Sequence, residues 1–229
     1  MMDPNGSPSI KILGVDTSTP IGSVGLIDGA RFVAEHTLSI VKAHSSRLMP
    51  AIDQILKWGD LAVHDLDACA VGIGPGSFTG IRIGVGTIKS LCYALKKPII
   101  GISTLEAIAY NLRYTDKLIC PILDARKDEV YGAVFRGGQN LLRKSDDLCV
   151  PIESLLSQID DDVIFVGDGL RRYAPVVQAQ FGEDVPLADP IFNVPRGVSI
   201  ARIGYDRLLD GQSGDYFSLT PNYVRDSVT

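Results

Sequence analysis

Two polar turns of this chain carry residue types that bind phosphate in nucleotide-binding proteins. The first is Asp16-Thr-Ser-Thr19, which follows a short apolar segment and offers a carboxylate, hydroxyl groups and backbone N–H groups. Such a turn can hold phosphate oxygens, and its aspartate can help to bind a metal ion. Asp, Ser and Thr also favour ordinary hairpin turns, because they bond to their own backbone. Since Ser18 stands where a glycine would admit phosphate more closely, we predict a degenerate phosphate turn at Asp16, Thr17 and Ser18.

The second turn is the glycine-rich segment Gly72-Ile-Gly-Pro-Gly-Ser77, which leads from an apolar strand into a helix. It fails the dinucleotide-binding fingerprint, because a third glycine would have to replace Ser77, and it lacks the Gly-Lys-Ser/Thr of a P-loop. A glycine-rich turn into a helix can still bind an anion, or it can be a tight turn without a ligand. We predict a structural loop that consists of Gly74, Pro75, Gly76, Ser77, Phe78 and Thr79.

Patterns of metal ligands and activated nucleophiles are missing from the sequence. The histidines His36, His44 and His64 are eight and twenty residues apart, so no two of them share one helical face as paired metal ligands do. The chain contains no His-Glu-x-x-His and no Gly-x-Ser-x-Gly, and Ser77 has no identifiable base partner. We therefore expect no metal site and no catalytic residue. The histidine spacing gives no support to a peptidase, which is one alternative function.

The helix predicted at Gly80 to Leu95 carries glycines where helices normally avoid them, at Gly80, Gly84 and Gly86. Each glycine in a helix interior costs about 0.8–1 kcal/mol relative to alanine. Gly80 and Gly84 are four residues apart and share a face, where a second element can approach closely. This glycine seam (Gly80 and Gly84) predicts a second contact, either internal or with another subunit. A separate apolar stripe faces the core and consists of Ile81, Val85, Ile88, Cys92 and Leu95.

The elements that must position these turns occur twice along the chain. The first half has apolar strands at 10–16, 22–27 and 31–36, of which the last two are joined by Asp-Gly, a strong hairpin signal. The second half repeats them at 118–124, 129–135 and 139–144, which puts Asp16 and Asp124 at matching places. Each set is followed by helix, strand and helix, at 45–58, 68–73 and 80–95 and again at 152–158, 163–166 and 170–181, and a final helix is predicted at about 195–209.

Two βββαβα halves make two related α/β lobes with a cleft between them. This is the two-lobed architecture of actin, hexokinase and the heat-shock ATPases. We predict a disordered leader at 1–9, because Pro, Gly and Ser dominate it, followed by an N-terminal actin-like lobe at 10–102 and a C-terminal actin-like lobe at 103–193. A C-terminal helix and tail at 194–229 are predicted to pack back on the lobes.

Composition restricts the function further. The chain has 229 residues, of which 45% are hydrophobic, and a net charge of −5 with a pI near 5.2. Such an acidic chain is a poor free-standing nucleic-acid binder, so a partner must hold any RNA that the protein serves. Four cysteines without a Cys-x-x-Cys pair suit a reduced, cytoplasmic compartment. No apolar run is long enough to span a membrane.

Taken together, these motifs resemble those of the TsaB (YeaZ) family over about residues 10–225. The resemblance implies a two-lobed actin-like fold of the ASKHA, ribonuclease H-like type. It also implies a non-catalytic subunit that binds and supports TsaD in the transfer of threonylcarbamoyl to adenosine next to the anticodon of tRNA. The motifs that carry the resemblance are Gly14-Val-Asp-Thr-Ser-Thr19, His44-Ser-Ser-Arg-Leu48, Gly74-Pro-Gly-Ser-Phe-Thr-Gly-Ile-Arg-Ile-Gly84, Asp124-Ala-Arg126 with Glu129-Val-Tyr131, and Pro221-Asn-Tyr-Val-Arg225.

The resemblance also implies where partners bind. TsaD holds a metal with a His-x-x-x-His pair on its first helix, and the matching residues here are His44 and Leu48, so the second ligand is missing. The family pairs two helices of its N-terminal lobe with those of TsaD, or with a second copy of itself. The glycine seam would then admit the partner's helices. The implied interface consists of His44, Leu48, Met49, Ala51, Ile52, Gly80, Arg82, Ile83, Gly84 and Thr87.

Further partners and cofactors are implied in the same way. TsaE, an ATPase, joins the pair, and tRNA is contacted only through the complex. We expect no tightly bound cofactor, and the joint between subunits is the one place left open for ATP or ADP. The alternative is a stand-alone ATP-dependent small-molecule kinase or ATPase of the same architecture. It would need a working phosphate turn at Asp16 and a second phosphate or adenosine motif after Val166. Gly167-Asp-Gly169 stands at about that place and is either this motif or a turn without a ligand.

Overall fold

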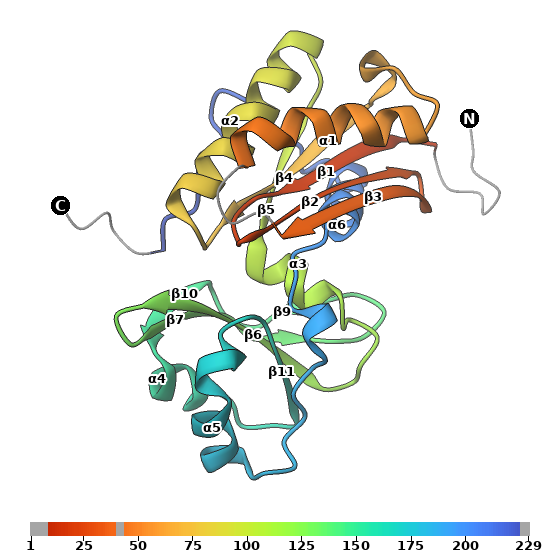
Figure 1. Ribbon diagram of the computed structural model, residues 1–229. Helices are drawn as coiled ribbons and strands as arrows, with labels where there is room; N and C mark the ends of the chain where they lie inside the picture. The colour runs from red at the N-terminus through yellow and green to blue at the C-terminus, as the bar shows by residue number, and fades with distance from the viewer. Residues whose placement is uncertain (1–8, 40–43, 225–229) are drawn as a thin grey trace. The chain divides into compact units, whose positions relative to one another are not determined.

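Figure 1 shows the computed structural model, which describes residues 9–39 and 44–224. The predicted leader at 1–9 lies, except for its last residue, outside the described residues. The chain forms two compact units. The first contains the residues up to Thr104 together with Pro195–Asn222, and the second is built mainly of Leu105–Val194. The stretch predicted as a separate C-terminal part, 194–229, is therefore part of the first unit from Pro195 to Asn222.

The first unit is built on a five-stranded sheet in the order β3-β2-β1-β4-β5. β2 is antiparallel to its neighbours β1 and β3, whereas β4 runs parallel to β1 and β5 parallel to β4. Nearly every residue of β1 is buried, as expected for a strand that is covered on both faces. The strands are β1 (Lys11–Asp16), β2 (Ile21–Asp28), β3 (Arg31–Ser39), β4 (Ala68–Gly74) and β5 (Ile99–Ser103).

Helices cover both faces of this sheet. α1 (His44–Trp58) and α2 (Phe78–Leu95) lie on one face, and α6 (Gly197–Leu209) lies on the other (Figure 1). The short 3₁₀ turn η1 (Val63–Asp65) connects α1 with β4. Among the helices of the described residues, none is both long and apolar enough to cross a membrane.

The second unit contains a six-stranded sheet in the order β10-β7-β6-β8-β9, with β11 parallel to β6. The strands are β6 (Leu118–Arg126), β7 (Glu129–Gly132), β8 (Phe135–Arg136), β9 (Leu142–Arg143), β10 (Leu148–Pro151) and β11 (Val163–Val166). Its helices are α3 (Thr104–Tyr110), α4 (Ile152–Leu156) and α5 (Leu170–Phe181), with a 3₁₀ turn η2 (Pro190–Phe192).

The strand pairing of the two units repeats. The central strand β6 is antiparallel to β7 and parallel to β11, as β1 is antiparallel to β2 and parallel to β4. β10 lies antiparallel to β7, as β3 does to β2. A parallel bridge between Phe165 and Leu187 even takes the place that β5 has beside β4. Both halves of the chain therefore fold by one plan.

The strand predicted at 139–144 forms only part of the third strand of the second unit. The strand predicted at 129–135 is interrupted after Gly132 and continues as β8, which keeps the register of β7 along β6. β9 pairs with β8 and β10 pairs with β7, so the third strand is split into two short pieces. The two pieces differ in burial, because Leu148 and Val150 of β10 pack against the core of the second unit, whereas Leu142 of β9 is 55% exposed. The prediction also omits β5 and α3, which follow each other without an intervening turn.

Candidate functional site

The turn after β1 is closed by its own hydrogen bonds. Asp16 is fully buried, and its Oδ1 accepts from Ser18 N at 2.8 Å and from Ser18 Oγ at 2.6 Å. Thr104 Oγ1 lies 3.2 Å from Asp16 Oδ2 and 2.8 Å from Ser18 Oγ, so it completes the cluster. The carboxylate and hydroxyl groups that a phosphate turn would offer to a ligand are thus bonded to each other.

Burial also changes the acidity of this carboxyl group. Loss of solvent raises the pKa of Asp16 to about 6, although the hydrogen bonds from Ser18 and Thr104 act in the opposite direction. β4 lies directly against the group, because a Cβ atom at Gly72 would stand 1.9 Å from Asp16 Oδ2. Elsewhere, the described part of the chain contains no group of three or more His, Cys, Asp or Glu side chains that could hold a metal ion.

Thr17 of the same turn fills the glycine seam of α2. Its Oγ1 donates to Gly80 O at 2.7 Å. A Cβ atom at Gly80 would lie 2.0 Å from Thr17 O, and one at Gly84 would lie 2.4 Å from Thr17 Oγ1. The prediction that the seam admits a partner's helices is therefore wrong: Gly80 and Gly84 are buried, and they admit the turn after β1. By contrast, a Cβ atom at Gly86 would meet nothing within 4 Å.

The predicted structural loop from Gly74 to Thr79 joins β4 to α2 and packs against the same turn. Ser77 N donates to Ser18 O at 2.7 Å, and Ser77 Oγ accepts from Gly80 N at 3.2 Å as the N-cap of α2. The N–H groups of Ser77 and Gly80 are therefore bonded within the chain. Phe78 is exposed, and the Arg82 guanidinium stacks 3.6 Å above its ring.

The predicted interface residues separate into two groups in the structure. Leu48, Ala51 and Ile52 of α1 are buried in the core of the first unit, so they are unavailable to a partner. Their spacing along α1 is that of a core stripe. The side chain of His44, at the start of α1, lies outside the described residues.

The accessible part of the predicted interface extends over both helices. Met49 is 49% exposed, Arg82 is exposed, and Ile83 and Thr87 are half-buried. Three further residues lie on the open sides of α1 and α2 and were not predicted: Pro50, Phe78 and Gly86. An apolar residue outside the core stripe is the signal that would have found Phe78. We call this surface the helix face; it consists of Met49, Pro50, Phe78, Arg82, Ile83, Gly86 and Thr87.

The matching turn of the second unit is open. Asp124, near the end of β6, is exposed, and its Oδ1 accepts from Arg126 N at 2.8 Å. The turn runs through positive φ angles at Arg126, Lys127 and Asp128, of 62°, 52° and 63°. Arg172 on α5 pairs with Asp128 and lies 3.9 Å from Asp124.

The second predicted motif, Gly167-Asp-Gly169, packs as a turn against β6. Gly169 N donates to Ile122 O at 3.0 Å, and Gly167 N donates to Asn193 Oδ1 at 2.7 Å. Loss of solvent raises the pKa of Asp168. The glycines here serve close contact with β6, since a Cβ atom at Gly167 would lie 2.2 Å from Ile122 O.

Known proteins share this fold and sequence. The family model for TsaD, tRNA N6-adenosine threonylcarbamoyltransferase, matches residues 33–204. The tRNA threonylcarbamoyladenosine biosynthesis protein TsaB of Bacillus subtilis is 32% identical, and the match covers 93% of each chain. The structure of YeaZ from Pseudomonas aeruginosa has a TM-score of 0.81 at 26% identity and covers 93% of this chain and 100% of that one. Component A of (R)-2-hydroxyglutaryl-CoA dehydratase from Acidaminococcus fermentans, with a TM-score of 0.51 at 14% identity over 88% of this chain and 100% of that one, shares the fold alone.

The duplicated βββαβα plan and the turn after β1 define a protein of the actin-like α/β class, as predicted. Within this class, sequence similarity over nearly the full length decides the family. The chain belongs to the TsaB (YeaZ) family.

Proposed function

We propose that this chain is a non-catalytic subunit in the biosynthesis of threonylcarbamoyladenosine in tRNA, and that it binds and supports a TsaD-type transferase. The enclosed Asp16 turn is the observation that carries this function. A nucleotide-hydrolysing enzyme of this architecture needs an open turn that can bind phosphate and metal. Here the carboxylate has 0% exposure and both of its oxygens accept hydrogen bonds from the chain. We therefore expect no tightly bound nucleotide, and ATP or ADP only at a joint with a partner.

The helix face is the surface that we assign to the partner. It combines apolar side chains, an exposed arginine and a bare glycine, Gly86, where a helix can approach closely. The family model that matches this chain is that of TsaD itself, so the transferase has related helices to pair with it. A second copy of the chain would use the same face when the transferase is absent, and TsaE would join the pair. With a net charge of −5, the chain leaves the tRNA to its partners, in the cytoplasm.

Reconstitution tests the function directly. Purified TsaD and TsaE from the same organism, with the enzyme that makes the threonylcarbamoyl adenylate, are incubated with tRNA in the presence and absence of this chain. Modified adenosine should form at a useful rate only when the chain is present. An equal rate without it, or hydrolysis of ATP by the chain alone, would contradict the assignment.

The helix face is tested by Met49→Glu. A carboxylate in the centre of an apolar interface loses its water without gaining a partner, so the affinity for TsaD should fall by at least about tenfold. Leu142→Glu is the matched control, because Leu142 is 55% exposed but lies on β9 of the second unit. Calorimetric titration measures both variants, and equal affinities would place the interface elsewhere.

A further inference from the structure

A small pocket lies beside α1 on the hairpin of β2 and β3. Its cavity volume is only about 20 Å³, little more than the roughly 10–15 Å³ that one water molecule requires. The pocket therefore suits a single small polar group rather than a nucleotide. Its lining includes Thr17, Ser23, His36, Arg47, Leu48 and Ala51.

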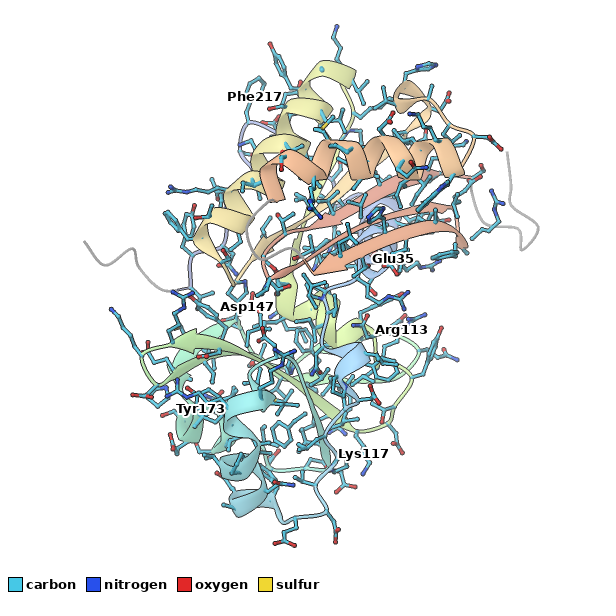
Figure 2. All side chains as sticks on the ribbon, in the orientation of Figure 1. Glu35, Arg113, Lys117, Asp147, Tyr173 and Phe217 are labelled. Atoms are coloured by element: carbon cyan, nitrogen blue, oxygen red, sulfur yellow. The ribbon has the colours of Figure 1, made fainter. Side chains whose placement is uncertain are left out.

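His36 lines this pocket. Val24 stands opposite it on β2, and the ring stacks on Trp58 of α1 with 5.9 Å between the ring centroids. Its neighbour Glu35, labelled in Figure 2, contacts the start of α6 on the other face, where it accepts from Val198 N at 3.2 Å. Both ring nitrogens of His36 are buried, and neither has a hydrogen-bond partner among the described residues. Buried polar atoms are normally paired, so the pocket lacks a group that this ring could bond.

The hydrogen-bonding groups that line the pocket indicate which chemical group would bond to the His36 ring. At least one imidazole nitrogen carries a hydrogen and donates, and the Arg47 guanidinium can only donate. Neighbouring hydroxyls are already in use, because Thr17 Oγ1 donates to Gly80 O and Ser23 Oγ accepts from Gly197 N. Among the residues that the structure describes, no aspartate or glutamate lines the pocket. The occupant must therefore accept hydrogen bonds and carry negative charge, which describes a carboxylate.

We propose that this pocket receives an aspartate or glutamate side chain of the TsaD-type partner, whose carboxylate bonds to His36 and pairs with Arg47; this rests on the function proposed above. The position of the pocket favours a partner's side chain over a free anion. Arg47 lines the pocket and is exposed, and Pro50 of the helix face follows three residues later, on the same side of α1. A protein that docks on the helix face therefore comes close to Arg47.

Two substitutions test the pocket in calorimetric titrations with TsaD. His36→Phe keeps a ring against Trp58 but removes both nitrogens, and Arg47→Met keeps the length of an exposed side chain but removes its charge. Each should weaken the complex by about tenfold or more, because the partner's carboxylate would stay buried and unpaired. His64→Phe and Arg31→Met are the controls, because His64 and Arg31 are exposed and lie outside the pocket. Thermal melts show whether each variant is folded, and Arg47→Met decides the test if His36→Phe does not fold.

A zero-length cross-link identifies the partner's residue. In the Arg47→Lys variant, a carbodiimide activates a nearby carboxylate, the lysine amine attacks it, an amide bond forms and the urea leaves. Mass spectrometry of the cross-linked complex should show position 47 joined to one aspartate or glutamate of TsaD. Wild-type affinity for both His36→Phe and Arg47→Met, or a structure of the complex with only water in the pocket, would overturn the pocket and leave the proposed function intact. No complex between the wild-type proteins would overturn both.

Discussion

The turn after β1 and the turn after β6 occupy the same place in two copies of one fold, but only the first is buried. Asp16 is enclosed by Ser18, Thr104 and β4, whereas the Asp124 side chain is 40% exposed. The helix that follows in each unit explains the difference. The third residue of α2 is Gly80, which lets Thr17 pack against the helix backbone.

The third residue of α5 is Arg172, and it gives the second turn the opposite environment. Its guanidinium pairs with Asp128 and lies 3.9 Å from Asp124, so the turn contacts the end of a long, half-exposed side chain instead of the helix backbone. One residue on a helix therefore decides whether the turn is part of the core or part of the surface. In this chain the turn after β1, which stands where a phosphate-binding turn would be, is part of the core.

The largest expected effect is that of Gly80→Leu, which breaks the buried turn. A Cβ atom already lies 2.0 Å from Thr17 O, so the turn and α2 must separate. Overpacking of this kind should lower the free energy of unfolding by about 3 kcal/mol, as measured in urea. Gly86→Ala is the matched control and should raise it by up to about 1 kcal/mol, since this helical position is open. A Gly80→Leu protein as stable as the wild type would show that Thr17 is not packed against the seam.

A smaller effect on the free energy of unfolding is expected from a change in pH. The folded pKa of Asp16 is raised from 3.8 to about 6, so between these values the folded protein binds more protons than the unfolded chain. The contribution of Asp16 to stability is therefore greatest at low pH and declines as pH rises through about 6. Asp16→Asn cannot titrate, so the stability of wild type minus that of Asp16→Asn should fall by about 2 kcal/mol from pH 4 to pH 8. A difference that stays constant in urea titrations across this range would rule out the buried, titrating carboxyl group.

The smallest effect on stability is expected from a change at the exposed turn after β6. Arg172→Met removes ion pairs to Asp124 and Asp128 that are partly in water, so stability should change by less than about 1 kcal/mol. Added salt should reduce the change further, because exposed pairs are screened. A loss as large as that of Gly80→Leu would mean that the second turn is part of the core as well.

Local patterns in the sequence were sufficient to predict most of the fold. The strands that begin each half, the helix at 170–181 and the duplicated order of elements all follow from apolar periodicity and turn residues, and the structure contains them. The third strand of the second half was predicted too short, because it includes Leu148–Pro151 as well as the piece within 139–144. Its extent is set by pairing with β7 and β8, and pairing is not a local property.

The site was predicted less well, for the same reason. The glycine seam indicates that another element lies close to α2. The sequence alone does not decide whether that element belongs to this chain or to a partner protein. The contact turned out to be Thr17, which is 63 residues away from Gly80 in the chain. Likewise, the spacing of Leu48 and Ile52 cannot tell a core stripe from an interface stripe, since both are apolar and helical. The exposure of Met49 could be predicted because this residue lies outside the stripe.

The first unit is discontinuous, and this orders events during synthesis. Its sheet is complete once β5 has left the ribosome, yet α6 covers one face of that sheet and comes about a hundred residues later. Translation proceeds from the N-terminus at roughly 5–20 residues per second, so the nascent sheet keeps an uncovered apolar face for seconds. The main part of the second unit, Leu105–Val194, is made within that interval and is contiguous in sequence. It can finish folding before the first, and a ribosome that stalls within residues 105–194 leaves a chain with a bare sheet for chaperones to hold.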